Sequence, residues 1–136
     1  MTPFSLKIVT PDGLKFDGQV EELIVRTTSG DLGIMAGHVN CVAPLGMGQA
    51  LIVTDGKRRV GACIGGMVSM VNGNATLVPT TFEWAEDIDT DRAAASEQRA
   101  KAVLTDKTST DTDIRMAEAR LKRALIRKNV ASHKAM

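Results

Sequence analysis

The sequence predicts an α+β protein in which an N-terminal β-sandwich precedes an antiparallel hairpin of two helices. All 12 glycines and all 4 prolines stand before Trp84, among short runs rich in Val, Ile and Thr. The remainder of the chain contains neither residue and is rich in Ala, Arg, Lys and Glu. Strand-like runs cut by turns, followed by an uninterrupted helix-forming stretch, indicate a change of architecture. We therefore expect two domains, residues 1–86 and residues 87–136.

Turns between apolar runs define the strands of the first domain. Apolar and polar side chains alternate over residues 4–8, and Thr10-Pro11-Asp12-Gly13 follows as a turn in which proline has a compatible φ. Asp55-Gly56 and Asn72-Gly73 each lie between apolar runs, and such pairs tolerate the positive φ of a tight hairpin turn. Seven or more strands in about 85 residues predict a β-sandwich or a flattened barrel.

The apolar pattern changes parity early in this domain. Leu14, Phe16 and Val20 are expected on one face of a strand, whereas the apolar residues of 23–25 have the opposite parity. A strand cannot reverse its faces without an irregularity. We therefore expect a bulge or a bend near Glu21-Glu22.

The second domain is expected to contain two helices. Asp87 or Asp89 can cap the first, which runs to about Leu104, and a short polar connector makes the two helices antiparallel neighbours. Thr110-x-x-Asp113 resembles a capping box for the second helix. A pair of this size buries little area and needs a partner or a ligand to hold one conformation. The apolar residues at helical spacing in the second helix are Ile114, Ala117, Leu121 and Leu125.

Composition and motifs argue against several classes of function. No apolar run is long enough to span a bilayer, and the first residues lack the features of a signal peptide. Cys41 and Cys63 have no metal-ligand spacing, and no phosphate loop, zinc-protease or hydrolase motif occurs. We interpret His38 as a turn or interface residue. The expectation is a protein without an active site, a metal centre or a membrane-inserted segment.

The two domains differ in charge. Residues 1–86 hold 6 basic and 8 acidic residues, whereas residues 87–136 hold 11 and 8. Arg120, Arg123 and Arg127 share one face of the second helix, where like charges repel. Spacing alone leaves two interpretations open, a solvated basic face or a face that meets an anion.

The start of the first helix is a candidate ligand site. It comprises Ile88-Asp89-Thr90-Asp91-Arg92-Ala93, and Arg99 follows about two turns after Arg92. In an antiparallel hairpin both arginines can share a cleft with Arg123 and Arg127, and guanidinium groups bind phosphate through paired N–H donors. The alternative is structural, with Asp89 capping the helix and pairing with Arg92.

Five segments carry a family resemblance that extends over essentially the whole chain. They are Val9–Gly13, Ser29–His38, Val42–Leu45, Gly65–Gly66 and Ala85–Asp89. Their order and spacing resemble the epsilon subunits of bacterial F-type ATP synthases. The resemblance implies a non-catalytic rotor subunit, peripheral on the cytoplasmic face of the plasma membrane. Its sandwich would bind the gamma subunit and the c-ring, with Asp31, Gly33 and His38 at that interface.

The resemblance also implies a regulatory hairpin. In the family the two helices change from a folded to an extended arrangement, and the extended second helix reaches the alpha and beta catalytic subunits and inhibits ATP hydrolysis. The basic residues expected to make that contact are Arg115, Arg120, Lys122, Arg123 and Arg127.

Some relatives bind ATP on the folded hairpin through an [Ile/Leu]-Asp-x-x-Arg-Ala motif. The resemblance therefore implies ATP, with or without Mg²⁺, as a regulatory ligand and not a substrate. Met116 replaces an arginine of those relatives, and Arg120 is an additional cation nearby. The residues expected to bind nucleotide are Glu83, Ile88, Asp89, Arg92, Ala93, Arg99, Arg123 and Arg127.

Two alternative functions are weighed against the rotor subunit. The first is a free-standing ATP-sensing module in which the sandwich merely supports the hairpin. The second is a nucleic-acid binder that uses the basic hairpin, which is disfavoured because acidic residues are interspersed and the net charge is only +1.

Overall fold

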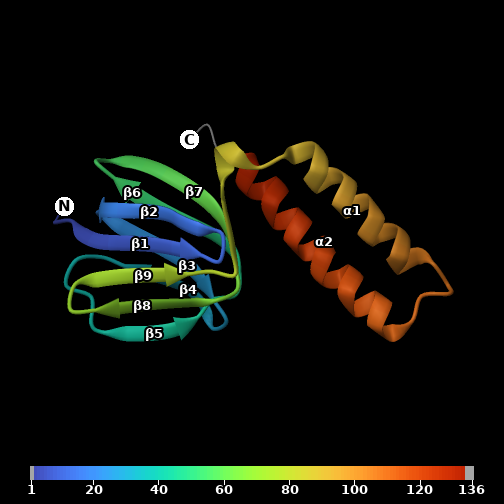
Figure 1. Ribbon diagram of the computed structural model, residues 1–136, viewed down its shortest axis with the longest axis horizontal. Helices are drawn as coiled ribbons and strands as arrows, with labels where there is room; N and C mark the ends of the chain where they lie inside the picture. Colours follow the sequence, from blue (N-terminus) through green and yellow to red (C-terminus); the bar gives the residue numbers. More distant parts are fainter. Residues whose placement is uncertain (1, 134–136) are drawn as a thin grey trace.

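Two five-stranded sheets form a β-sandwich in the computed structural model, which describes residues 2–133 (Figure 1). Alternating apolar side chains of the two sheets pack against each other in its core. The first sheet has the order β2 (Gly13–Val20), β1 (Phe4–Thr10), β9 (Asn74–Val78), β8 (Met67–Val71) and β5 (Cys41–Pro44). The second has the order β10 (Thr81–Trp84), β7 (Lys57–Ile64), β6 (Met47–Thr54), β3 (Glu22–Thr27) and β4 (Gly30–Ile34). The predicted sandwich followed by helices is confirmed.

The core of the sandwich draws on both sheets. Leu6, Ile8 and Leu77 of the first sheet and Val25 and Ile34 of the second are completely buried. Among the described strands the pairing is antiparallel except between β1 and β9. This core needs no residue of the helices.

The predicted change of parity occurs where the chain passes from the first sheet to the second. The chain bends at Glu21, between β2 in the first sheet and β3 in the second. A separate register shift between Ile8 and Val9 pairs Val9 with Leu14 and leaves Lys15 as an extra residue. This bulge turns Leu14 to the outer face, where it is 60% exposed. The expectation that Leu14 shares a face with Phe16 is therefore wrong.

Both predicted dipeptide turns are confirmed. Asp55 and Asn72 have φ values of 51° and 48°, and the glycine after each also has a positive φ. Three strands, β4, β5 and β10, were not predicted from the sequence. All are short, and glycine or proline interrupts the apolar pattern of β4 and β5.

The hairpin consists of α1 (Thr90–Thr105) and α2 (Asp111–Ala131) after a short 3₁₀ turn, Ala85–Asp87. Asp89, and not Asp87, caps α1 by accepting a hydrogen bond from the Arg92 backbone N–H at 3.0 Å. Thr110 and Asp113 form both hydrogen bonds of the capping box. Leu125 was expected on the packed face of α2 but is 46% exposed, because the seam follows Ala124 instead.

A second, smaller apolar cluster joins the hairpin to the sandwich. Figure 1 shows the hairpin projecting from one end of the sandwich, with its turn farthest away. Only the last turns of α2 and the linker pack against the second sheet. The buried residues of this cluster, here called the docking cluster, are Leu51, Val60, Ala62, Ala85, Ile88, Val130 and Ala131, with Ile24, Val53 and Ile126 partly buried around them.

Substitution of Gly61 tests how tightly side chains pack where the sandwich meets the linker. A Cβ at Gly61 would overlap the ring of Phe82, which is buried and packs edge-on against Trp84 at 4.9 Å between centroids. We expect Gly61→Ala to lower the free energy of unfolding by about 1–3 kcal/mol in urea denaturation, as overpacking does. Gly33→Ala is the control, since its Cβ would meet open space. Equal stability of the two variants would contradict this packing.

Candidate functional site

Four arginines from both helices line a cleft on one side of the hairpin. The cleft has a volume of about 280 Å³ and is lined by Ser96, Arg99, Arg120, Arg123 and Arg127. We call it the arginine cleft. Positions i, i+3 and i+7 bring the three arginines of α2 onto one face, and Arg99 meets them from α1.

Small residues allow the two helices to approach. Ala93 and Ala100 of α1 and Ala117 and Ala124 of α2 are all buried between them. Alanine side chains contribute little buried area, so the seam holds the helices together weakly. Groups on either side of the seam must therefore add to the stability of the hairpin.

Most of the positive charge of the arginine cleft is uncompensated. No carboxylate lines it, and within residues 2–133 no ion pair includes Arg99, Arg120 or Arg123. Converging guanidinium groups repel each other and present many N–H donors without acceptors. The arrangement suits an anion with several oxygen atoms, such as a polyphosphate.

Arg127 connects the arginine cleft to the sandwich. Its Nε donates a hydrogen bond to Oε1 of Glu83 in β10 at 2.6 Å. The contact brings Glu83 to the end of the cleft. It also fixes the orientation of α2 relative to the second sheet.

Glu97 and Lys128 connect the two helices beside the alanine seam. Lys128 Nζ donates to both carboxylate oxygens of Glu97, at 2.9 and 3.1 Å. Lys101 Nζ lies 3.8 Å from Oε2 of the same carboxylate. Glu97 is almost completely buried, at 4% exposure. The hydrogen bond from Lys128 lowers the pKa of this carboxyl below its ordinary value. Neither this pair nor the pair between Glu83 and Arg127 was predicted, because both depend on how the helices are rotated.

The structure places the other predicted nucleotide-binding residues outside the arginine cleft. Ile88 is buried in the docking cluster, and Ala93 is buried in the helix seam. Asp89 serves as the helix cap, while the Arg92 side chain is exposed and does not line the cleft. The residues brought together are thus Arg99, Arg123 and Arg127, with Glu83 bound to Arg127.

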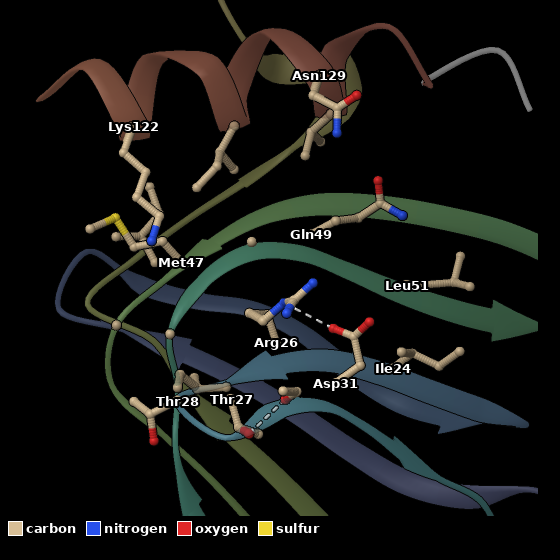
Figure 2. A pocket seen from close by; sticks show the side chains of 18 residues that line it. Ile24, Arg26, Thr27, Thr28, Asp31, Met47, Gln49, Leu51, Lys122 and Asn129 are labelled. Atoms are coloured by element: carbon tan, nitrogen blue, oxygen red, sulfur yellow. Dashed lines mark hydrogen bonds and ion pairs between the residues drawn. The ribbon is translucent and has the colours of Figure 1, made fainter. Parts of the chain in front are cut away.

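The predicted inhibitory residues of α2 point in different directions. Lys122 lines a wide groove of about 1100 Å³ between α2 and the second sheet. In Figure 2 its side chain extends from α2 toward Met47, and Asn129 lies farther along the same helix. Arg120, Arg123 and Arg127 face the arginine cleft instead. Arg115 is exposed at the start of α2.

The three predicted rotor-interface residues lie on β4 and the loop that follows it. Asp31 pairs with Arg26 of β3 at 3.0 Å on the floor of the groove (Figure 2), and both side chains are more than half exposed. Gly33 is exposed on the same edge strand. The Nδ1 atom of His38 lies 2.8 Å from the carbonyl oxygen of Val39, within hydrogen-bond distance.

An apolar row crosses the outer face of the first sheet. Pro44 pairs with Met67, Met67 with Val78, and Val9 with Leu14, while β1 and β9 are neighbours. Leu14, Met67 and Val78 are all more than 40% exposed. Exposed apolar side chains gathered in this way mark an interaction surface. This row was not predicted from the sequence, because it depends on the bulge that turns Leu14 outward.

Within residues 2–133 no group of three or more His, Cys, Asp or Glu side chains gathers around a point that a metal ion could occupy. None of the helices described is at once long and apolar enough to cross a membrane.

Glu97 gives the hairpin a pH dependence. Its pKa is lowered in the folded chain, so its contribution to stability is present above its ordinary pKa of 4.5 and is lost as the pH falls through the folded value. We expect Glu97→Gln to lower the melting temperature of the helices at pH 7. It should also flatten the decline of that temperature between pH 5 and pH 3, followed by circular dichroism.

The exposed Glu118 on α2 provides the control. Glu118→Gln should leave both the melting temperature and its pH dependence nearly unchanged. A wild-type acid profile in Glu97→Gln would show that this pair does not hold the hairpin.

Comparison with known proteins assigns both parts of the chain to one family. The model described as ATP synthase, Delta/Epsilon chain, beta-sandwich domain matches residues 3–85. The model described as ATP synthase, Delta/Epsilon chain, long alpha-helix domain matches residues 86–132.

Curated relatives match over nearly the whole chain. The ATP synthase epsilon chain of Bacillus velezensis is 42% identical over 133 residues, which cover 98% of this chain and 100% of that protein. The ATP synthase epsilon chain of Bacillus subtilis is 44% identical over 115 residues, covering 85% of this chain and 86% of that one.

Two solved structures share the fold. A chain of the OSCP/F1/c-ring structure of the Euglena gracilis mitochondrial ATP synthase aligns with a TM-score of 0.83 at 20% identity, over 98% of this chain and 83% of that chain. A chain of the Tetrahymena thermophila central stalk/c-ring structure aligns with a TM-score of 0.59 at 14% identity, over 93% and 95%. The family models and the curated relatives show that the chain belongs to the family of ATP synthase delta/epsilon chains.

Proposed function

We propose that this chain is a rotor subunit whose sandwich joins the gamma subunit to the c-ring and whose hairpin restrains ATP hydrolysis under the control of ATP. As a family member it is a non-catalytic subunit of the F-type ATP synthase and belongs to the central stalk. The observation that carries the regulatory part is the arginine cleft, in which three of the four arginines have no ion-pair partner among residues 2–133. Within the complex the chain would lie peripherally at the cytoplasmic face of the plasma membrane.

The outer surface of the sandwich suits the rotor contacts. The apolar row offers a surface for the gamma subunit, since exposed apolar patches of this kind are covered in assemblies. Asp31, Gly33 and His38 lie together at the β4 edge and the next loop, where Val39 is 74% exposed. We assign the c-ring and the adjoining part of gamma to this edge.

The small size of the docking cluster suits a reversible hairpin. Undocking α2 would expose Val130, Ala131 and the buried part of Ile126. At about 1.5–3 kcal/mol for each large side chain, docking contributes roughly 3–6 kcal/mol. The sandwich core remains whole when these contacts break, because none of its residues comes from the helices.

ATP would favour the folded hairpin. Arg99 of α1 and Arg123 of α2 lie in one cleft only while the helices are antiparallel neighbours. A ligand shifts a conformational equilibrium by its differential affinity for the two states. ATP bound between the helices therefore opposes their separation and serves as a regulator.

When ATP is scarce, the opened hairpin would present its basic residues to the catalytic subunits. Arg120, Arg123 and Arg127 face α1 in the folded hairpin, and Lys122 faces the groove. Opening would release them, together with the exposed Arg115, toward an acidic surface of the alpha and beta subunits. Inhibition of hydrolysis would follow from that contact.

The two alternative functions receive less support. A free-standing ATP sensor leaves the apolar row and the family membership of the sandwich without a role. A nucleic-acid binder needs its basic residues on an open surface, whereas here three arginines of α2 line a cleft of only about 280 Å³.

Calorimetric titration of the chain with ATP tests the nucleotide site. We expect stoichiometric binding that Arg123→Ala weakens about tenfold or more, since hydrogen bonds between charged groups are worth about 1.5–3 kcal/mol. Lys107→Ala removes an equal charge from the exposed connector and should bind ATP as the wild type does. Equal loss of ATP affinity in both variants would show that the loss reflects net charge and not a specific contact of Arg123.

Asp89 requires a comparison of two variants because it also caps α1. Asp89→Asn keeps a good cap but removes the charge, whereas Asp89→Ala removes both. If Asp89 contacts nucleotide as an anion, both variants weaken binding. If Asp89 acts only as a cap, Asp89→Asn binds like the wild type.

A chain ending after Ile88 separates assembly from inhibition. Since the sandwich core is independent of the helices, we expect this shortened chain to assemble with gamma and the c-ring. ATP hydrolysis by the assembled enzyme should rise relative to the full chain, measured as phosphate release. Failure to assemble would show that the helices have a structural role in the stalk.

A further inference from the structure

The arginine cleft continues toward the hairpin turn. A second hollow of about 360 Å³ lies between the same two helices, with an apolar floor that includes Ala100, Val103 and Met116. Arg99 and Arg120 line both hollows, so the two spaces adjoin at this pair of side chains. Arg120 therefore stands at the boundary between them.

The charges of the two hollows differ. The arginine cleft has four guanidinium groups and no carboxylate on its wall. The hollow at the turn is lined by Asp106 and Asp113, whose carboxylate oxygens accept hydrogen bonds from the backbone of Thr108 and Thr110. A phosphate chain that enters the arginine cleft is attracted as far as Arg99 and Arg120 and is repelled beyond them.

Spacing along α2 relates these arginines to the length of a phosphate chain. Arg120 and Arg127 are seven residues apart, which corresponds to about 10 Å along the helix axis. A single phosphate cannot contact both ends of such a row, whereas a chain of phosphates can. Arg127 is already held by Glu83 at one end, while no ion pair among residues 2–133 includes Arg120 at the other.

We infer that Arg120 is a ligand-binding residue that contacts the terminal phosphate of the bound nucleotide and makes the site selective for a triphosphate over a diphosphate. The inference rests on the nucleotide site proposed above and adds Arg120 to it. Arg120 and Arg99 close the arginine cleft at the end nearer the turn. A diphosphate anchored at Arg123 and Arg127 has no third phosphate to place beside them.

Calorimetry of the full chain with ATP and with ADP tests this role. Arg120→Ala is expected to weaken ATP binding about tenfold or more and ADP binding less than threefold, so that the ratio of the two affinities falls. Arg120→Lys keeps the charge without the guanidinium fork and should restore part of the loss. Lys107→Ala controls for net charge, and circular dichroism confirms that each variant retains its helices.

Inorganic triphosphate separates failure of this inference from failure of the proposed function. If Arg120→Ala leaves the ratio of ATP to ADP affinity unchanged while ATP still binds, the role of Arg120 is overturned and the nucleotide site stands. If ATP does not bind but triphosphate binds in a manner that depends on Arg120, the cleft is a polyphosphate site, and both nucleotide sensing and the selectivity assigned to Arg120 are overturned. If neither ligand binds, both are overturned.

Discussion

The helical hairpin is joined to the sandwich by few apolar side chains, and the regulation proposed for this protein depends on that weak junction. Its seam consists of alanines, and its junction with the sandwich is a cluster separate from the main core. Adjacent residues of α2 supply the polar attachments, Arg127 to Glu83 in β10 and Lys128 to Glu97 in α1. The sandwich is complete without the helices, and the helices are attached to it by a small cluster. The hairpin can therefore separate from the sandwich without disrupting the core of the sandwich.

A comparison of free energies indicates that a bound metabolite can control the arrangement of the hairpin. Docking contributes roughly 3–6 kcal/mol through a few apolar side chains. A ligand present at a hundred times its dissociation constant stabilises the state that binds it by about 2.7 kcal/mol. The two quantities are comparable, so occupancy of the arginine cleft can decide between arrangements of similar free energy.

Much of this architecture could be predicted from local chemistry, and the failures have identifiable causes. The confinement of glycine and proline to the first part, the Asn72-Gly73 turn and the Thr110 capping box act within a few residues and were read correctly. Leu14 was misassigned because its face depends on a bulge set by pairing with β1. For the site, the arginine spacing on α2 was visible in the sequence. The partners of Glu83 and Glu97 were not, because they depend on the rotation of packed helices.

The distance between α1 and α2, measured with and without ATP, shows whether the nucleotide controls the hairpin. Nitroxide labels at Gln98 of α1 and Glu118 of α2, both exposed, would report it by pulsed electron resonance in the chain assembled with gamma, after Cys41→Ser and Cys63→Ala remove the native thiols. We expect a broad distribution with long distances in the absence of ATP and one short, narrow distribution when ATP is saturating. Identical distributions under both conditions would contradict a hairpin controlled by nucleotide.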